Sequence, residues 1–155
     1  MRRIPALVLA AAVALVTGAA AAASAPAAAP TVLQVYKSAT CGCCKAWVER
    51  MREAGFEVRV TDLEDAALQE RKARLGVGPR LASCHTAVVN GYVVEGHVPA
   101  ADIRRLLAQK PAVAGIAAPG MPVGSPGMES PDGQRDRYDV VSFTRDGTVR
   151  TFARH

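Results

Sequence analysis

The residues with the clearest chemistry in this 155-residue chain are its four cysteines, three of which fall within four positions. Cys41, Cys43 and Cys44 follow the hydroxyl-bearing residues 38–40 and precede apolar residues at helical spacing, so we expect them in the first turn of a helix. The free N–H groups and the dipole at that end favour thiolate over thiol, and Lys45 adds a positive charge. Thiolates are nucleophiles in disulfide exchange and soft metal ligands, so position alone leaves both chemistries open.

The segment Cys41-Gly42-Cys43-Cys44-Lys45 looks like the thioredoxin active-site sequence with its central proline replaced by cysteine. A third thiol in the turn would attack or scramble a disulfide between Cys41 and Cys44, which compromises a simple two-cysteine redox cycle. As a metal ligand, the same thiol simply adds a soft donor. The cluster therefore favours metal binding, with a plain disulfide and one spare thiol as the alternative.

Five further residues are candidate metal ligands: Cys84, His85, His97, Met121 and Met128. Cys84 and His85 start a predicted strand, where neighbouring side chains point to opposite faces, so His85 is the weakest candidate. The methionines each follow a glycine in a Pro/Gly-rich loop, and thioether with thiolate is a donor set that suits Cu(I).

Each of these candidates also has a structural explanation. Cys84 suits a small buried strand position or a partner for Cys43, and His97 can cap a helix or face solvent. Met121 and Met128 can anchor their loop to the core. Structural zinc is less favoured, because paired Cys-x-x-Cys knuckles are absent from the sequence.

The elements that must position these residues alternate along the chain. Asn90-Gly91 between two apolar runs is a strong hairpin signal, and Gly55 and Gly76 are good helix ends. The predicted order is strand 31–36, helix from 41–44 to Gly55, strand 56–60, helix 62–75, hairpin strands 81–89 and 92–95, and helix 101–109. This order predicts a thioredoxin-like α/β fold, a mixed sheet flanked by helices.

The C-terminal part departs from that pattern. Residues 111–137 are rich in Gly and Pro and carry both candidate methionines, which predicts a long irregular loop. Residues 138–144 and 148–154 flank Asp146-Gly147, so 138–155 should form a further β-hairpin that extends the sheet or caps the loop.

The N-terminus resembles a secretory leader. Arg2 and Arg3 precede an apolar run and then small residues, so we expect residues 1–25 to be a cleaved signal peptide, with cleavage between Ala20 and Ala25. We expect residues 26–30 to be an Ala/Pro tether and residues 31–155 to form the thioredoxin-like metal-binding domain. The apolar run is short for a bilayer span, so an uncleaved anchor is the lesser alternative and no stable membrane span is expected after cleavage.

The charge pattern argues against nucleic acid as a partner. Without Arg2 and Arg3, 17 basic residues stand against 14 acidic ones, a net charge near +3. Acidic and basic residues are interleaved, as in Glu49-Arg50-Met51-Arg52-Glu53, which is typical of a solvated helix face. No basic run with interspersed aromatics is present to follow a phosphate backbone.

Four motifs together resemble the CopG-like periplasmic copper-resistance family, over about Val32 to the C-terminus. They are Cys41-Gly42-Cys43-Cys44, Ser83-Cys84-His85-Thr86-Ala87, Gly96-His97-Val98-Pro99, and Pro119-Gly120-Met121-Pro122 with Gly124-Ser125-Pro126-Gly127-Met128-Glu129. The resemblance implies a thioredoxin-like protein that binds several Cu(I) ions through its cysteines, with Met and His support.

Residues and resemblance together predict an exported, periplasmic copper-resistance or homeostasis protein. Its Cu(I) ligands would be Cys41, Cys43, Cys44, Cys84, His97, Met121 and Met128, with His85 the weakest, in a thiolate-bridged cluster. Its partners would be copper ions and other periplasmic copper-handling proteins. The alternative is a thiol–disulfide or copper oxidoreductase in which Cys41 attacks and Cys44 resolves.

Overall fold

The computed structural model describes residues 30–155, so the predicted leader and residues 26–29 of the tether lie outside it. Within this range the chain forms three helices and seven strands. In chain order they are β1 (Val32–Lys37), α1 (Gly42–Glu53), β2 (Glu57–Asp62), α2 (Asp65–Arg74), β3 (His85–Val89), β4 (Tyr92–Gly96), α3 (Ala100–Gln109), β5 (Gly115–Ala118), β6 (Asp139–Phe143) and β7 (Val149–Arg154).

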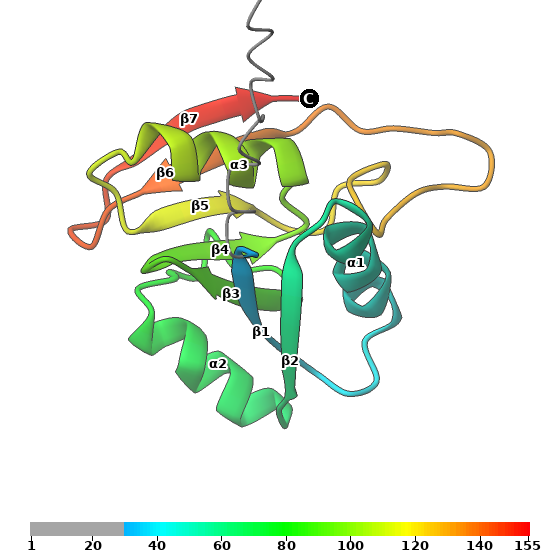
Figure 1. The fold of residues 1–155 in the computed structure, drawn as a ribbon, viewed down its shortest axis with the longest axis horizontal. Helices are drawn as coiled ribbons and strands as arrows, with labels where there is room; N and C mark the ends of the chain where they lie inside the picture. The colour runs from blue at the N-terminus through cyan, green and yellow to red at the C-terminus, as the bar shows by residue number, and fades with distance from the viewer. Residues whose placement is uncertain (1–29) are drawn as a thin grey trace, which may run out of the picture.

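The strands form one mixed sheet in the order β2-β1-β3-β4-β5-β6-β7. The β1–β2 and β4–β5 pairs are parallel, and the other neighbours are antiparallel. Buried side chains of α1 and α3 share the larger core with β1, β3 and β4, and Figure 1 shows α2 on the other side of the sheet. The predicted mixed α/β sheet flanked by helices is confirmed, while its assignment as thioredoxin-like stays a prediction.

The first strand and helix show how the sequence positions the cysteines. In β1 the alternate residues Leu33 and Val35 are fully buried, and in α1 the same core receives Trp47 and Met51. The helix ends as predicted near Gly55, which has a left-handed φ of +84°. The start differs from the prediction, because Cys41 itself is the N-cap and its Sγ accepts a hydrogen bond from Cys44 N at 3.4 Å.

The clearest difference from the prediction is β5, which lies inside the segment expected to be an irregular loop. Its four residues are all buried, and it pairs with β4 in parallel and with β6 antiparallel. A Cβ on Gly115 would lie 2.1 Å from the Val93 carbonyl oxygen, so only glycine permits this close approach. The surrounding Gly and Pro residues hid the strand from the sequence analysis.

The terminal hairpin forms where it was predicted. Because β6 pairs with β5, the hairpin extends the sheet, and β7 is its last strand. Val140 and Phe143 of β6 are buried against the two sides of the sheet. Among residues 30–155, no helix combines the length and apolar character that crossing a bilayer requires.

Candidate metal centre

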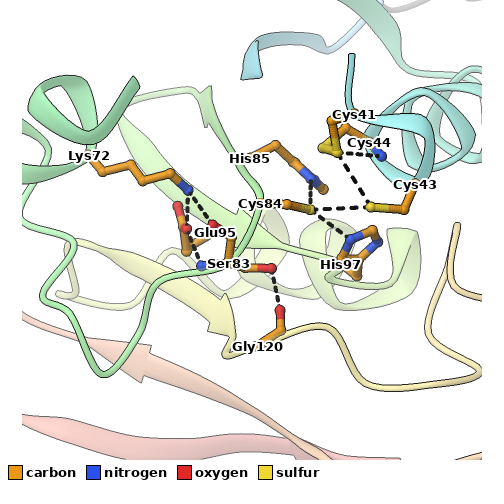
Figure 2. Close-up of polar contacts among 10 residues, drawn as sticks. All are labelled: Cys41, Cys43, Cys44, Lys72, Ser83, Cys84, His85, Glu95, His97 and Gly120. Carbon is orange, nitrogen blue, oxygen red and sulfur yellow. Dashed lines mark hydrogen bonds and ion pairs between the residues drawn. A yellow bond between two sulfur atoms is a disulfide. The ribbon is translucent and has the colours of Figure 1, made fainter. Parts of the chain in front are cut away.

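Two of the four cysteines are joined at the N-terminus of α1. Cys41 and Cys44 form a disulfide, with their Cα atoms 5.4 Å apart (Figure 2). Cys44 is buried and Cys41 half-buried. Neither sulfur can act as a thiolate ligand until this bond is reduced.

The sulfur atoms of the other two cysteines, Cys43 and Cys84, lie next to the disulfide and form a row with it. Cys43 Sγ lies 3.4 Å from Cys41 Sγ and 3.6 Å from Cys84 Sγ, and both Cys43 and Cys84 are free thiols. The four ligand atoms all lie within 4.8 Å of one another. The loop before β3 therefore brings Cys84 to the predicted cluster.

His97 lies directly against this row. Its Nε2 is 3.0 Å from Cys84 Sγ, and its Nδ1 is 2.8 Å from the carbonyl oxygen of Pro126. A carbonyl only accepts, so Nδ1 carries the proton and Nε2 presents a lone pair to the sulfur. Burial lowers the pKa of His97 below its usual value, while the hydrogen bond to Pro126 opposes this shift. The neutral ring is suited to metal ligation.

His85 joins the same group, contrary to the prediction that it points away from Cys84. The strand β3 begins only at His85, so Cys84 precedes the strand and alternation does not apply to the pair. His85 Nδ1 is 3.4 Å from Cys84 Sγ, and the ring is fully buried between Trp47 and His97. Burial lowers its pKa well below the usual value, and the charges of His97 and Lys72 add to the effect.

The environment of Cys84 keeps its thiol protonated. The pKa of Cys84 is raised to about 12, mainly by burial. The nearby Cys43 also raises the pKa, and its effect outweighs the lowering by the Ser83 hydrogen bond and the Lys72 charge. Cys84 therefore enters a metal site by exchanging its thiol proton for the metal ion, and the proton is released to solvent.

A buried ion pair that no sequence motif indicated holds the chain next to Cys84. Lys72 and Glu95 are 2% and 0% exposed and form an ion pair between α2 and β4. Lys72 Nζ also donates to Ser83 O at 3.0 Å, and Ser83 N donates to Glu95 Oε1 at 2.7 Å (Figure 2). A single charged residue inside the apolar run Val93-Val94-Glu95-Gly96 was the available signal.

The methionine loop, which is the segment 119–138 between β5 and β6, touches the site through its backbone. Ser83 Oγ donates to Gly120 O, and Pro126 O accepts from His97. Met121 is 53% exposed and Met128 is half-buried. The structure thus gathers four cysteines and two histidines, and this group can hold a metal ion; the roles of both methionines stay predictions.

Comparison with known proteins identifies the family. Residues 81–128 match the family described as "Protein of unknown function, DUF411". The solved structure "Copper resistance protein copG- Form 1" is 45% identical, with a TM-score of 0.75, and the match covers 82% of this chain and 98% of that chain. Form 2 is 46% identical, with the same TM-score, and the match covers 82% and 99%. No curated protein matches. This similarity over nearly the whole length of both solved chains shows that the chain belongs to the CopG copper-resistance family.

Proposed function

We propose that this protein binds several Cu(I) ions in a thiolate-bridged cluster and so contributes to copper resistance or homeostasis. Reduction of the Cys41–Cys44 disulfide makes four cysteine sulfurs available as ligands within 4.8 Å of one another, and that grouping is the observation that carries the proposal. Thiolates are soft ligands that favour Cu(I), and a shared sulfur can bridge neighbouring ions.

The surroundings of the cysteines support the same function. The N-terminus of α1 stabilises thiolate charge at Cys41 and Cys44. His97 adds a neutral nitrogen donor, oriented by Pro126, on the side of Cys84. The methionine loop is anchored by Gly120 O to Ser83 and by Pro126 O to His97, and the proposal assigns the thioethers of Met121 and Met128, which lie close in sequence to these anchors, as further soft ligands.

A second candidate is a copper or thiol–disulfide oxidoreductase. The Cys41–Cys44 disulfide favours it. In the balanced reaction, the two thiols lose two protons and two electrons to form the disulfide, and two Cu(II) ions each gain one electron to become Cu(I). Activity that survives replacement of both Met121 and Met128 would favour this candidate.

The proposed location is the periplasm, reached through the predicted leader. An oxidising compartment permits the Cys41–Cys44 disulfide, and membership in a copper-resistance family fits a role outside the cytoplasm. Other periplasmic copper-handling proteins would deliver or accept the ions.

Anaerobic titration of the fully reduced domain with Cu(I) against a competing chelator tests the proposal. We expect several ions per chain, with loss of all four reactive thiols counted on the same sample. The Cys41→Ser/Cys44→Ser variant should lose tight multi-ion binding, and undiminished binding would refute the cluster. His155→Gln is the matched control, because His155 pairs with Asp102 and lies outside the Cys/His group.

The contribution of the methionines needs a separate comparison. Met121→Leu/Met128→Leu keeps the apolar bulk of both side chains and removes only the thioethers. A drop in Cu(I) affinity at unchanged stability indicates Met ligation, whereas unchanged affinity restricts the site to Cys and His.

A further inference from the structure

The disulfide form of the protein still contains three metal-binding side chains beyond Cys43, on the side away from the disulfide. Cys84 Sγ, His85 Nδ1 and His97 Nε2 belong to one group whose ligand atoms lie within 4.8 Å of one another. None of them takes part in the Cys41–Cys44 disulfide. Figure 2 shows both imidazoles directed at the Cys84 sulfur from different sides.

The two rings are held in place before any ion arrives. His97 donates from Nδ1 to Pro126 O at 2.8 Å, which leaves Nε2 free to bind. His85 is fully buried, with its ring centroid 4.5 Å from that of Trp47 and 4.9 Å from that of His97. Within residues 30–155, His85 Nε2 is buried without a hydrogen-bond partner, so packing against Trp47 and His97 is what fixes the orientation of the His85 ring. The hydrogen bond from His97 Nδ1 to a backbone carbonyl is typical of a metal-ligating histidine.

The donor chemistry differs from that of the full cysteine cluster. Four clustered thiolates favour several monovalent soft ions, whereas one thiolate with two neutral imidazoles suits a single divalent ion such as Cu²⁺ or Zn²⁺. Cys43 Sγ, 3.6 Å from Cys84 Sγ, lies beside this set.

We propose that the disulfide form binds one divalent transition-metal ion through Cys84, His85 and His97. The redox state of Cys41 and Cys44 then decides which ions the protein carries: several Cu(I) ions when they are thiols, and one divalent ion when they are joined. This inference rests on the proposed function only for its copper context, because its three ligands are independent of the disulfide pair.

Co²⁺ is the probe, because it has the same charge and ligand preferences as Zn²⁺ and reports thiolate ligation by its absorption. The disulfide-form protein, with two alkylatable thiols confirmed by mass, is titrated anaerobically without reductant. We expect one Co²⁺ per chain, sulfur-to-cobalt charge-transfer bands, and displacement by one equivalent of Zn²⁺. Absence of 1:1 binding, or binding without the charge-transfer bands, would overturn the proposal.

Two variants test the ligands individually. Cys84→Ser should abolish the charge-transfer bands, and His97→Gln should weaken binding by more than the ~10–100-fold that loss of an outer partner costs. His155→Gln, with its histidine outside the group, should bind like the wild type. Wild-type affinity in folded Cys84→Ser and His97→Gln proteins would overturn the assignment.

The Cys41→Ser/Cys44→Ser variant separates this inference from the proposed function. It cannot form the four-thiolate cluster, yet it retains Cys84, His85 and His97, so we expect it to bind one Co²⁺ like the disulfide form. If reduced wild-type protein fails to bind several Cu(I) ions while this variant binds Co²⁺, the cluster is refuted and the divalent site stands. The reverse result refutes the divalent site alone.

Discussion

At the scale of single residues, Cys84 connects the two halves of the centre. It contacts Cys43 on one side and both His85 and His97 on the other. Burial raises its pKa to about 12, so below that pH the residue is a thiol, and its thiolate fraction grows about tenfold per pH unit. Since only the thiolate is nucleophilic, we expect slow alkylation of Cys84 by iodoacetamide at pH 8 in the metal-free disulfide form, with a rate that rises steadily toward pH 11.

Peptide mass spectrometry over an alkylation time course checks this expectation. The same protein in denaturant is the internal control, because unfolding returns the thiol to its ordinary pKa of about 8.5 and should make labelling fast. Labelling of native Cys84 at pH 8 as rapid as in the unfolded chain would contradict the buried environment.

The clustering of Cys41, Cys43 and Cys44 was predictable from sequence, because their spacing alone brings three sulfur atoms together at the start of a helix. The orientation of His85 was not, because it depends on where β3 begins, and that boundary lies between Cys84 and His85. The pairing of Lys72 with Glu95 was also hidden, since it joins residues that are 23 positions apart on different elements. Sequence periodicity identifies which side chains are buried but not which buried polar groups meet.

At the scale of elements, the methionine loop depends on a glycine where it crosses α1. Gly127 has a φ of +82°, and a Cβ there would lie 2.5 Å from Trp47 N and 2.8 Å from Cys43 O. Both atoms belong to the helix backbone and cannot move aside easily. We expect Gly127→Ala to lift the loop from α1, to withdraw the Pro126 carbonyl from His97 and to lower Cu(I) affinity by about 10–100-fold.

Gly133→Ala is the matched control for that change. Gly133 has a similar φ of +76°, but an added Cβ would meet nothing within 4 Å. Both variants carry the conformational cost of alanine in the left-handed region, about 1–2 kcal/mol, and only Gly127→Ala adds the clash. Chelator competition and thermal unfolding measured on both proteins separate the two effects, and equal Cu(I) affinities would show that the contact with α1 does not orient His97.

Most helices and strands were predictable from local sequence signals, and β5 was the exception. The Asn90-Gly91 and Asp146-Gly147 turns and the apolar stripes of α1 and α3 are local signals. In contrast, β5 is four residues long, starts with a glycine and is stabilised by neighbours from distant parts of the chain. Such a strand is defined by its pairing partners, which local sequence does not reveal.

At the scale of the whole molecule, the Lys72–Glu95 pair links the layer formed by α2 to the metal centre. Lys72 lies on α2 and Glu95 on β4. Both side chains form hydrogen bonds with the backbone of Ser83, the residue before Cys84. Glu95 pairs across the strands with Thr86, next to His85. Global stability and the position of Cys84 therefore depend on the same buried charges.

Replacement of Lys72 by Met tests this coupling. The change keeps most of the aliphatic stem but leaves the Glu95 carboxyl buried without its cation, so we expect the free energy of unfolding to fall by about 3–5 kcal/mol in urea titrations. Lys45→Met removes an exposed lysine from α1 and should change the free energy of unfolding by no more than about 0.5 kcal/mol.

The double variant Lys72→Met/Glu95→Met removes the isolated charge, so much of the lost free energy of unfolding should be recovered. The recovery stays incomplete, because Ser83 N–H then lacks its acceptor, at about 1–3 kcal/mol. A double variant no more stable than Lys72→Met would mean that the two side chains act through packing and not through their charges.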